Sequence, residues 1–201
     1  MRYDHMLIMS FVEKGSKVLD LGCGNGELLY ALKKEKGVNG RGIDIKEEKI
    51  AKCFEKGLSA IHLDIDKGLS DYNDKVFDYV ILNDTLQAVK RPVTVVKEAA
   101  RIGKKIIITF PNFAHYSIRL NLLLTGRMPK SKTLPYEWYD TPNIHLFTIK
   151  DFIMLCKKND FRIINSVYYN KSNQTGLRIN LHPNFFAKNA LFVINSKALK
   201  S

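Results

Sequence analysis

The sequence lacks the features that mark secreted, membrane-spanning and metal-binding proteins. Its three cysteines, Cys23, Cys53 and Cys156, are odd in number and widely spaced, without a Cys-x-x-Cys pair. This pattern predicts neither a disulfide framework nor a zinc site, and we expect no bound metal. No segment approaches the roughly 18 to 20 apolar residues that cross a membrane. We therefore expect a soluble, cytoplasmic protein with no membrane contact.

Acidic side chains are scarce in one half of the chain only. Residues 1–100 carry 16 Lys and Arg against 16 Asp and Glu, whereas residues 101–201 carry 16 against 4, which accounts for the net charge of +12. The surplus suggests an acidic partner or substrate for the second half, although scattered lysines are also typical of ordinary solvated surface. The length and the hydrophobic content of 45% predict one folded domain over residues 1–201.

Short apolar runs alternate with amphipathic helical patterns in the first half. Strands are expected at 17–21, 40–45, 58–63, 76–82 and 104–110, and helices at 27–36, at 46–56 and from Pro92 up to Gly103. Strands joined by helical crossovers predict a parallel sheet in a doubly wound α/β fold.

The second half departs from this rhythm. A helix is expected over 113–124, and residues 126–147 form a loop that holds three of the six prolines. A loop of this length is uncommon unless it serves as a lid or a binding surface. Thr148 and Asp151 fit a capping box, and strands are expected at 161–169 and 188–195. Residues 170–187 are expected to form a polar hairpin loop or an edge extension.

The strongest chemical signal is the turn that follows the first expected strand. Asp20 and Leu21 lead into Gly22-Cys23-Gly24-Asn25-Gly26, and glycines there let the backbone approach a ligand beside a helix N-terminus. Position 27 is Glu, so the Gly-x-Gly-x-x-Gly dinucleotide pattern fails. Gly-x-Gly-x-Gly after a strand-end acid resembles motif I of class I S-adenosylmethionine-dependent methyltransferases.

That resemblance implies a cofactor, S-adenosylmethionine or S-adenosylhomocysteine, and residues to hold it. Asp20 would orient the cofactor's amino group, Asp44 would accept from the ribose hydroxyls, and Asp64 would contact the adenine amino group. Leu63 and Ile65 would flank the ring. The implied cofactor-binding set is Asp20, Gly22, Cys23, Gly24, Asn25, Gly26, Asp44, Ile45, Leu63, Asp64, Ile65 and Asn83.

Longer segments narrow the resemblance to one family. They are residues 18–29, 41–44, 77–82, 85–88, 110–113, 126–129 and 134–146, and the last two are the most distinctive. Together they resemble the methionine biosynthesis protein MetW family, over roughly residues 4 to 169. The resemblance implies a Rossmann-like class I methyltransferase fold, three-layer α/β/α, with a mostly parallel seven-stranded sheet and an antiparallel last strand. It also implies homoserine O-acetyltransferase as partner.

The residues do not decide whether methyl transfer takes place. Candidate acids or bases are His115, Glu137, Asp140 and His145, of which His115 is the weak catalytic candidate and His145 is expected to be structural. Candidates for substrate or partner contact are Asn112, Tyr136, Glu137, Trp138 and Tyr139.

Three functions therefore stay open. The first is a MetW-like protein that binds the cofactor and acts with the acetyltransferase. The second is a small-molecule O-methyltransferase. The third is a nucleic-acid methyltransferase or binder, which only the basic second half supports and which we do not favour. Under the first two, about 17–110 would be the cofactor half and 111–201 the substrate or partner half.

Overall fold

The computed structural model describes residues 1–130, 135–170 and 177–196. Its strands are β1 (Lys17–Leu21), β2 (Asn39–Asp44), β3 (Ser59–His62), β4 (Phe77–Asn83), β5 (Gly103–Pro111), β6 (Phe161–Tyr169) and β7 (Asn189–Ser196). Its α-helices are α1 (Tyr3–Phe11), α2 (Glu27–Lys36), α3 (Glu47–Glu55), α4 (Pro92–Ile102), α5 (Tyr116–Thr125), α6 (Ile149–Lys158), α7 (Leu177–Leu181) and α8 (Pro183–Phe186), and two 3-10 turns are η1 (Ile65–Lys67) and η2 (Leu86–Ala88). No helix in this described part is long and apolar enough to cross a membrane.

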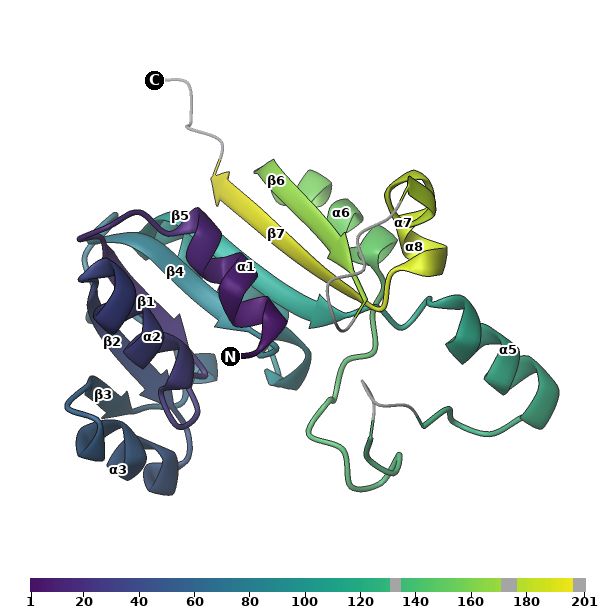
Figure 1. Ribbon diagram of the computed structural model, residues 1–201, viewed down its shortest axis with the longest axis horizontal. Helices are drawn as coiled ribbons and strands as arrows, with labels where there is room; N and C mark the ends of the chain where they lie inside the picture. The colour runs from purple at the N-terminus through teal and green to yellow at the C-terminus, as the bar shows by residue number, and fades with distance from the viewer. Residues whose placement is uncertain (131–134, 171–176, 197–201) are drawn as a thin grey trace.

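The seven strands form one sheet in the order β3-β2-β1-β4-β5-β7-β6, as Figure 1 shows. Strands β1 to β5 are paired in parallel, and β7 is antiparallel to both of its neighbours, β5 and β6. The mostly parallel sheet with an antiparallel last strand is therefore confirmed. Because β1 to β5 are parallel, their carboxyl ends lie at the same edge of the sheet, where open α/β folds bind ligands.

Helices cover both faces of the sheet, which gives three layers (Figure 1). Alternate residues of β4 enter different cores: Tyr79 and Ile81 pack with α1, α2 and α3, whereas Val80 and Leu82 pack with α4 and α6. This follows from the alternation of side chains along a strand. Helix α5 instead projects away from the sheet.

The structure differs from the sequence-based predictions at two places at the periphery of the fold: one helix was missed and one expectation is wrong. Helix α1 was not predicted from the sequence, and its buried residues include Asp4 and His5 beside Ile8 and Met9, so its apolar stripe is interrupted. The hairpin or edge extension expected over 170–187 is wrong for the residues described there, because 177–186 hold α7 and α8; residues 171–176 of that stretch lie outside the described ranges.

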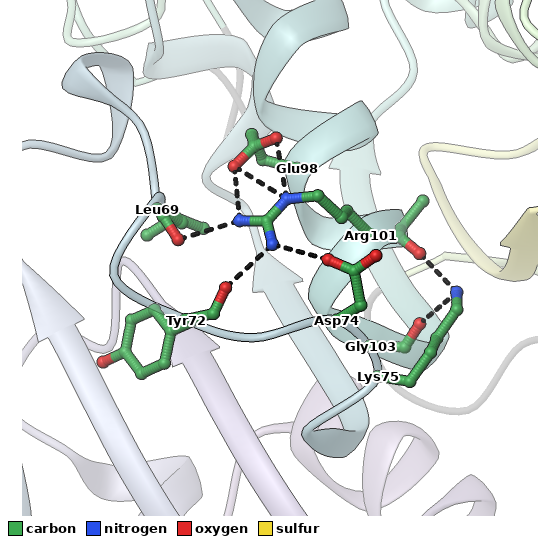
Figure 2. A network of polar contacts seen from close by, with 8 residues as sticks. Leu69, Tyr72, Asp74, Lys75, Glu98, Arg101 and Gly103 are labelled. Atoms are coloured by element: carbon green, nitrogen blue, oxygen red, sulfur yellow. Dashed lines mark hydrogen bonds and ion pairs between the residues drawn. The ribbon is translucent and has the colours of Figure 1, made fainter.

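Two cationic side chains, Arg101 and Lys75, make hydrogen bonds at the end of the sheet where β4 and β5 begin (Figure 2). The Arg101 guanidinium donates to the carbonyls of Leu69 and Tyr72 and to the carboxylates of Asp74 and Glu98, at 2.8–3.3 Å. Beside it, the Lys75 Nζ donates to the carbonyls of residues 100 and 103. These contacts hold the loop before β4 against the end of α4.

Candidate functional site

The turn between β1 and α2, residues 22–26, is shaped by glycines with left-handed backbone angles. Gly22 has a φ of 77°, and a Cβ there would lie 2.5 Å from Oγ1 of Thr85. Gly24 has a φ of 54°, and a Cβ there would meet no atom within 4 Å. The first glycine is therefore required by close packing, whereas the second leaves backbone open to a ligand. We call this segment the glycine turn.

Asp20, at the end of β1, is a buried acid with an unused oxygen. The residue is 2% exposed, and its Oδ1 has no hydrogen-bond partner within the described residues. Burial, and then the nearby Asp44, raises the pKa of Asp20 from 3.8 to about 7. An unsatisfied buried carboxyl is unfavourable unless a donor or cation reaches it, so such a group often marks a binding site.

Asp44, at the end of β2, connects the glycine turn to β2 by a hydrogen bond. Its Oδ2 accepts from the N–H of Gly24 at 2.8 Å, and its Oδ1 accepts from the N–H of Lys46 at 2.9 Å. A carboxylate has about four acceptor sites, so these two bonds leave room for ligand hydroxyls.

The residues after β3 are placed by local contacts. Leu63 and Ile65 are half-buried and pack against the core, and Oδ1 of Asp64 accepts from the N–H of Asp66 at 3.0 Å. Asp64 thereby caps η1. Ile45, after β2, is exposed.

A cleft of about 300 Å³ opens between the glycine turn and α1. We call it the glycine cleft. Six of the residues predicted to bind the cofactor line it: Asp20, Gly22, Cys23, Gly24, Asn25 and Asn83. Asp44 is hydrogen-bonded to the lining residue Gly24. The lining does not include the other predicted residues, which are Gly26, Ile45, Leu63, Asp64 and Ile65.

Sequence reasoning missed four charged or titratable residues that line the glycine cleft. They are Arg2, which is the N-cap of α1, His5 from α1, Glu27 from α2 and Lys49 from α3. Burial lowers the pKa of His5. The available signal was weak. Ile8, Met9 and Val12 in and just after α1 join the core, but apolar and polar residues are poorly separated between the faces of this helix.

Cys23 of the glycine turn contacts Cys53 of α3, which is thirty positions away in the chain. The sulfurs of Cys23 and Cys53 are 4.0 Å apart, and Cys53 Sγ contacts the carbonyl of Gly24 at 3.4 Å. Both are buried thiols, and burial raises the pKa of each. They therefore act here as small packing groups.

Asn112 is placed inside the fold, not on a binding surface. It is 1% exposed, and its Nδ2 donates to the carbonyls of Asn184 and Ala187. Its Oδ1 accepts from the N–H groups of Ala114 and Ile149. All positions of the amide are used internally, so the structure gives Asn112 a structural role in place of the expected substrate or partner contact.

His115 likewise has a structural place. It is buried, and its Nδ1 accepts from the N–H of Ser117 and contacts the Ser117 hydroxyl, which caps α5. Burial, and then Lys188, lowers the pKa of His115 to about 4, so the ring is neutral at neutral pH. His115 does not line the glycine cleft, and this geometry gives no support to catalysis by it. His145 donates its backbone N–H to the carbonyl of Gln87.

The aromatic loop residues expected to contact a substrate or partner surround a separate cavity. Tyr136, Glu137 and Trp138 line a space of about 350 Å³ together with Phe113, which lies between β5 and α5. The exposed rings of Trp138 and Tyr139 meet edge to face at 5.5 Å. Glu137 pairs with Lys130 at 2.6 Å. Leu134, the first residue of the distinctive 134–146 segment, lies outside the described residues.

Two relatives are similar to this chain in sequence. A bifunctional methionine biosynthesis protein MetXA/MetW from Rhodopirellula baltica is 33% identical over 201 residues, which are 96% of this chain and 32% of that protein. A ubiquinone biosynthesis O-methyltransferase from Methylococcus capsulatus is 32% identical over 54% of this chain and 48% of its own length. This chain thus spans a third to a half of these relatives.

Among solved structures, the methyltransferase in complex with the Haloferax volcanii Trm112 methyltransferase activator has a TM-score of 0.73 at 18% identity, covering 100% of this chain and 92% of that one. A SAM-dependent methyltransferase from Archaeoglobus fulgidus has a TM-score of 0.65 at 18% identity, covering 94% and 93%. The fold is therefore the Rossmann-like class I methyltransferase fold. The family model described as "Methionine biosynthesis protein MetW" matches residues 2–194, so this chain belongs to the MetW family.

Proposed function

We propose that this chain binds S-adenosylmethionine or S-adenosylhomocysteine and acts with homoserine O-acetyltransferase in methionine biosynthesis. The bifunctional relative from Rhodopirellula baltica carries the proposal, because a MetXA part and a MetW part are joined there in one polypeptide. Fusion keeps two domains at a high effective concentration. Separate chains that do the same work need an interface instead.

The glycine cleft supports the cofactor part of the proposal. It offers open backbone at Gly24 and an unpartnered buried acid at Asp20, and both fit a nucleoside that carries an ammonium group. Asp44 would take the ribose hydroxyls, and Asp64 would lie near the adenine with Leu63 and Ile65. Bound S-adenosylmethionine would supply an electrophilic methyl group. Since that cofactor is made from methionine, its occupancy would report the supply of the pathway's product.

The face around α5 supports the partner part. We define the α5 face as Leu120, Leu123 and Leu124, which are exposed at i, i+3 and i+4 on that helix; Trp138 and Tyr139 of the following loop are also exposed. Leu123 and Leu124 are 81% and 77% exposed on a helix that projects from the sheet (Figure 1). Exposed apolar patches with Trp and Tyr are typical of protein interfaces.

The charge around the α5 face indicates the kind of partner surface it fits. Residues 113–130 carry Arg119, Arg127 and Lys130 and no acid. An apolar partner surface with an acidic rim would complement them. We therefore propose the α5 face as the surface that contacts the acetyltransferase, with Tyr136, Glu137, Trp138 and Tyr139 as further candidate contacts.

The test is co-purification of the two proteins, with acetyltransferase activity measured with and without this chain and with added S-adenosylhomocysteine. The double variant Leu123→Glu/Leu124→Glu should abolish the complex, because it puts two charges into an apolar contact. The control is Phe54→Glu, an equally polar change at an exposed position on α3. Absence of a complex and unchanged activity with the wild-type chain would contradict the proposal.

A second candidate function, transfer of a methyl group to a small molecule, is favoured by the cavity of about 350 Å³ behind the aromatic loop. Its aromatic and apolar lining would suit a ring-bearing acceptor. The partial likeness to the ubiquinone biosynthesis O-methyltransferase is in keeping with this. Incubation with methyl-labelled S-adenosylmethionine and a cell extract should then label a small molecule. If the cofactor-loaded protein labels nothing, the candidate is excluded.

A further inference from the structure

A second pocket lies beside α6 and is separate from the glycine cleft. It has a volume of about 270 Å³ and is lined by residues of η2, α4 and α6 and by the loop segment 144–147. None of the residues that line it lines the glycine cleft. We call it the α6 pocket.

The turn η2 and its N-cap contact both sites but keep them distinct. Thr85, the N-cap, donates from Oγ1 to the carbonyl of Leu21 at 2.9 Å and packs closely against Gly22 of the glycine turn. Leu86, the next residue, lines the α6 pocket and belongs to the core that includes residues of α4 and α6. The two sites therefore contact this turn through different residues.

The walls of the α6 pocket are mostly apolar. Leu86 and Phe152 are each 1% exposed, whereas Ile144 and Leu146 are 53% and 44% exposed. An occupant would shield the two exposed side chains from water, and burial of apolar surface is favourable. The volume is close to the lower limit of roughly 300 Å³ for ligand sites, so the pocket fits a small molecule.

Two side chains of this lining have polar atoms that are available to a ligand. Oδ2 of Asp151 accepts from the N–H and the hydroxyl of Thr148 at 2.9 and 2.8 Å, while Oδ1 accepts from none of the described residues. Nε2 of His145 is buried and has no hydrogen-bond partner within those residues. Among the described residues no Lys or Arg lines the pocket, so Asp151 sets its charge.

A negative charge and a histidine nitrogen in an apolar space favour a basic ligand. A protonated amine has three donors and one positive charge, so it can donate to Asp151 and to the imidazole nitrogen of a neutral His145. A carboxylate would be repelled by Asp151, and an alcohol has one donor and no charge. The lining therefore selects an amine over an acid or an alcohol of the same shape.

We propose that the α6 pocket is a binding site for a small primary amine with an aromatic or branched apolar body. The ammonium group donates to Asp151 and His145, and the body packs against Leu86, Phe152 and Leu155. This site goes beyond the proposed function, because it needs neither the nucleoside nor the acetyltransferase.

The test uses the full chain and three probes that share a phenylethyl body. The probes are 2-phenylethylamine, 2-phenylethanol and 3-phenylpropionate, and calorimetry at neutral pH measures their affinities. We expect a dissociation constant of about 1 mM or below for the amine, an affinity at least about tenfold weaker for the alcohol, and no binding of the acid. No binding of the amine, or equal affinities for the amine and the acid, would overturn the site.

Two variants locate the amine in the α6 pocket. Leu155→Trp fills the space and should abolish binding, whereas Ile153→Trp, at an exposed position on the same helix outside the lining, should leave it unchanged. Asp151→Asn keeps an oxygen for Thr148 but removes the charge. It should weaken binding of the amine at least about tenfold, as expected for one charged hydrogen bond, without changing the affinity for the alcohol.

Thermal denaturation shows whether each variant is folded. If folded Asp151→Asn binds the amine as tightly as wild type, or folded Leu155→Trp still binds it, the amine lies elsewhere and the inference is overturned. Failure of the wild-type chain to bind S-adenosylhomocysteine would contradict the proposed function alone, since the amine titration is made without that ligand.

Discussion

The two ends of the parallel strands differ in how their charged side chains are paired. Where β4 and β5 begin, Arg101 donates to two backbone carbonyls and two carboxylates (Figure 2). Where β1 ends, Asp20 is buried with an oxygen that has no partner within the described residues. At the first end the chain itself satisfies the charged groups, whereas at the other end Asp20 offers an acceptor that the proposed ligand would complete. The comparison therefore contrasts residues that stabilise the fold with residues proposed to bind a ligand.

Replacement of Asp20 should give the largest effect, and it should depend on pH. The unfolded chain loses the Asp20 proton near its ordinary pKa of 3.8, whereas the folded protein holds it up to about 7. As pH rises from about 4 to about 7, the free energy of unfolding therefore falls by on the order of 4 kcal/mol. Asp20→Asn should be more stable than wild type at pH 8 and equal to it near pH 3, as measured by urea denaturation at each pH.

The control for that measurement is an aspartate at the opposite edge. A hydrogen bond from Lys104, and then one from the N–H of Lys17, lowers the pKa of Asp78. Asp78→Asn should therefore lose a little stability above its unfolded pKa, because it removes a favourable charge. If Asp20→Asn is also less stable than wild type at pH 8, the contrast between the two edges is wrong.

Replacement of Arg101 should destabilise the fold without touching the glycine cleft. Arg101→Met keeps most of the packing but leaves two carbonyls and two carboxylates without their donor. We expect a loss of about 2–3 kcal/mol in the free energy of unfolding. Thermal denaturation with calorimetric titration of S-adenosylhomocysteine checks this, since the affinity should stay the same. A loss of affinity would show that the two edges are coupled.

Replacement of Asp44 should weaken ligand binding, in contrast to replacement of Arg101, which should lower stability. Asp44→Ala should weaken binding of S-adenosylhomocysteine by about 1.5–3 kcal/mol, because a charged acceptor is lost. Asp44→Asn keeps an acceptor for one of the N–H groups of Gly24 and Lys46, and should bind with intermediate affinity. Calorimetry of both variants is the measurement. If Asp44→Ala binds as tightly as wild type, the carboxylate does not serve the ligand.

The smallest effect concerns the left-handed backbone of Lys75, which has a φ of 53°. Both Lys75→Ala and Lys75→Gly lose the Nζ contacts to the carbonyls of residues 100 and 103. Glycine adopts this φ without strain, so Lys75→Gly should be more stable than Lys75→Ala by about 1 kcal/mol. Denaturation of the two variants measures the difference directly. An equal stability would mean that the loop rearranges once Nζ is gone.

The sequence was sufficient where local patterns decide the structure. Strands β1, β4 and β5 were predicted within two residues because buried parallel strands are largely continuous apolar runs. The glycine turn was recognisable because Gly22 and Gly24 need backbone angles that other residues avoid. The capping box of Thr148 and Asp151 is present as expected, since it depends on residues three positions apart.

The sequence was insufficient where contacts between distant segments decide. The sequence predicts a contact role for Asn112, but its partners at 184 and 187 are more than seventy positions away. Arg2 and His5 reach the glycine cleft only because α1 packs across the sheet. The same holds for Cys23 and Cys53, whose proximity no spacing rule reveals.

The position of β7 has a consequence for the order of folding. In the native sheet β7 lies between β5 and β6, so β6 has no native strand partner until residues 189–196 have been synthesised. The first five strands need no such delay, because each pairs with a strand already made. On the ribosome we therefore expect the glycine cleft to assemble before β6 pairs with β7. Pulse-labelled hydrogen exchange should find β6 among the last strands to gain protection.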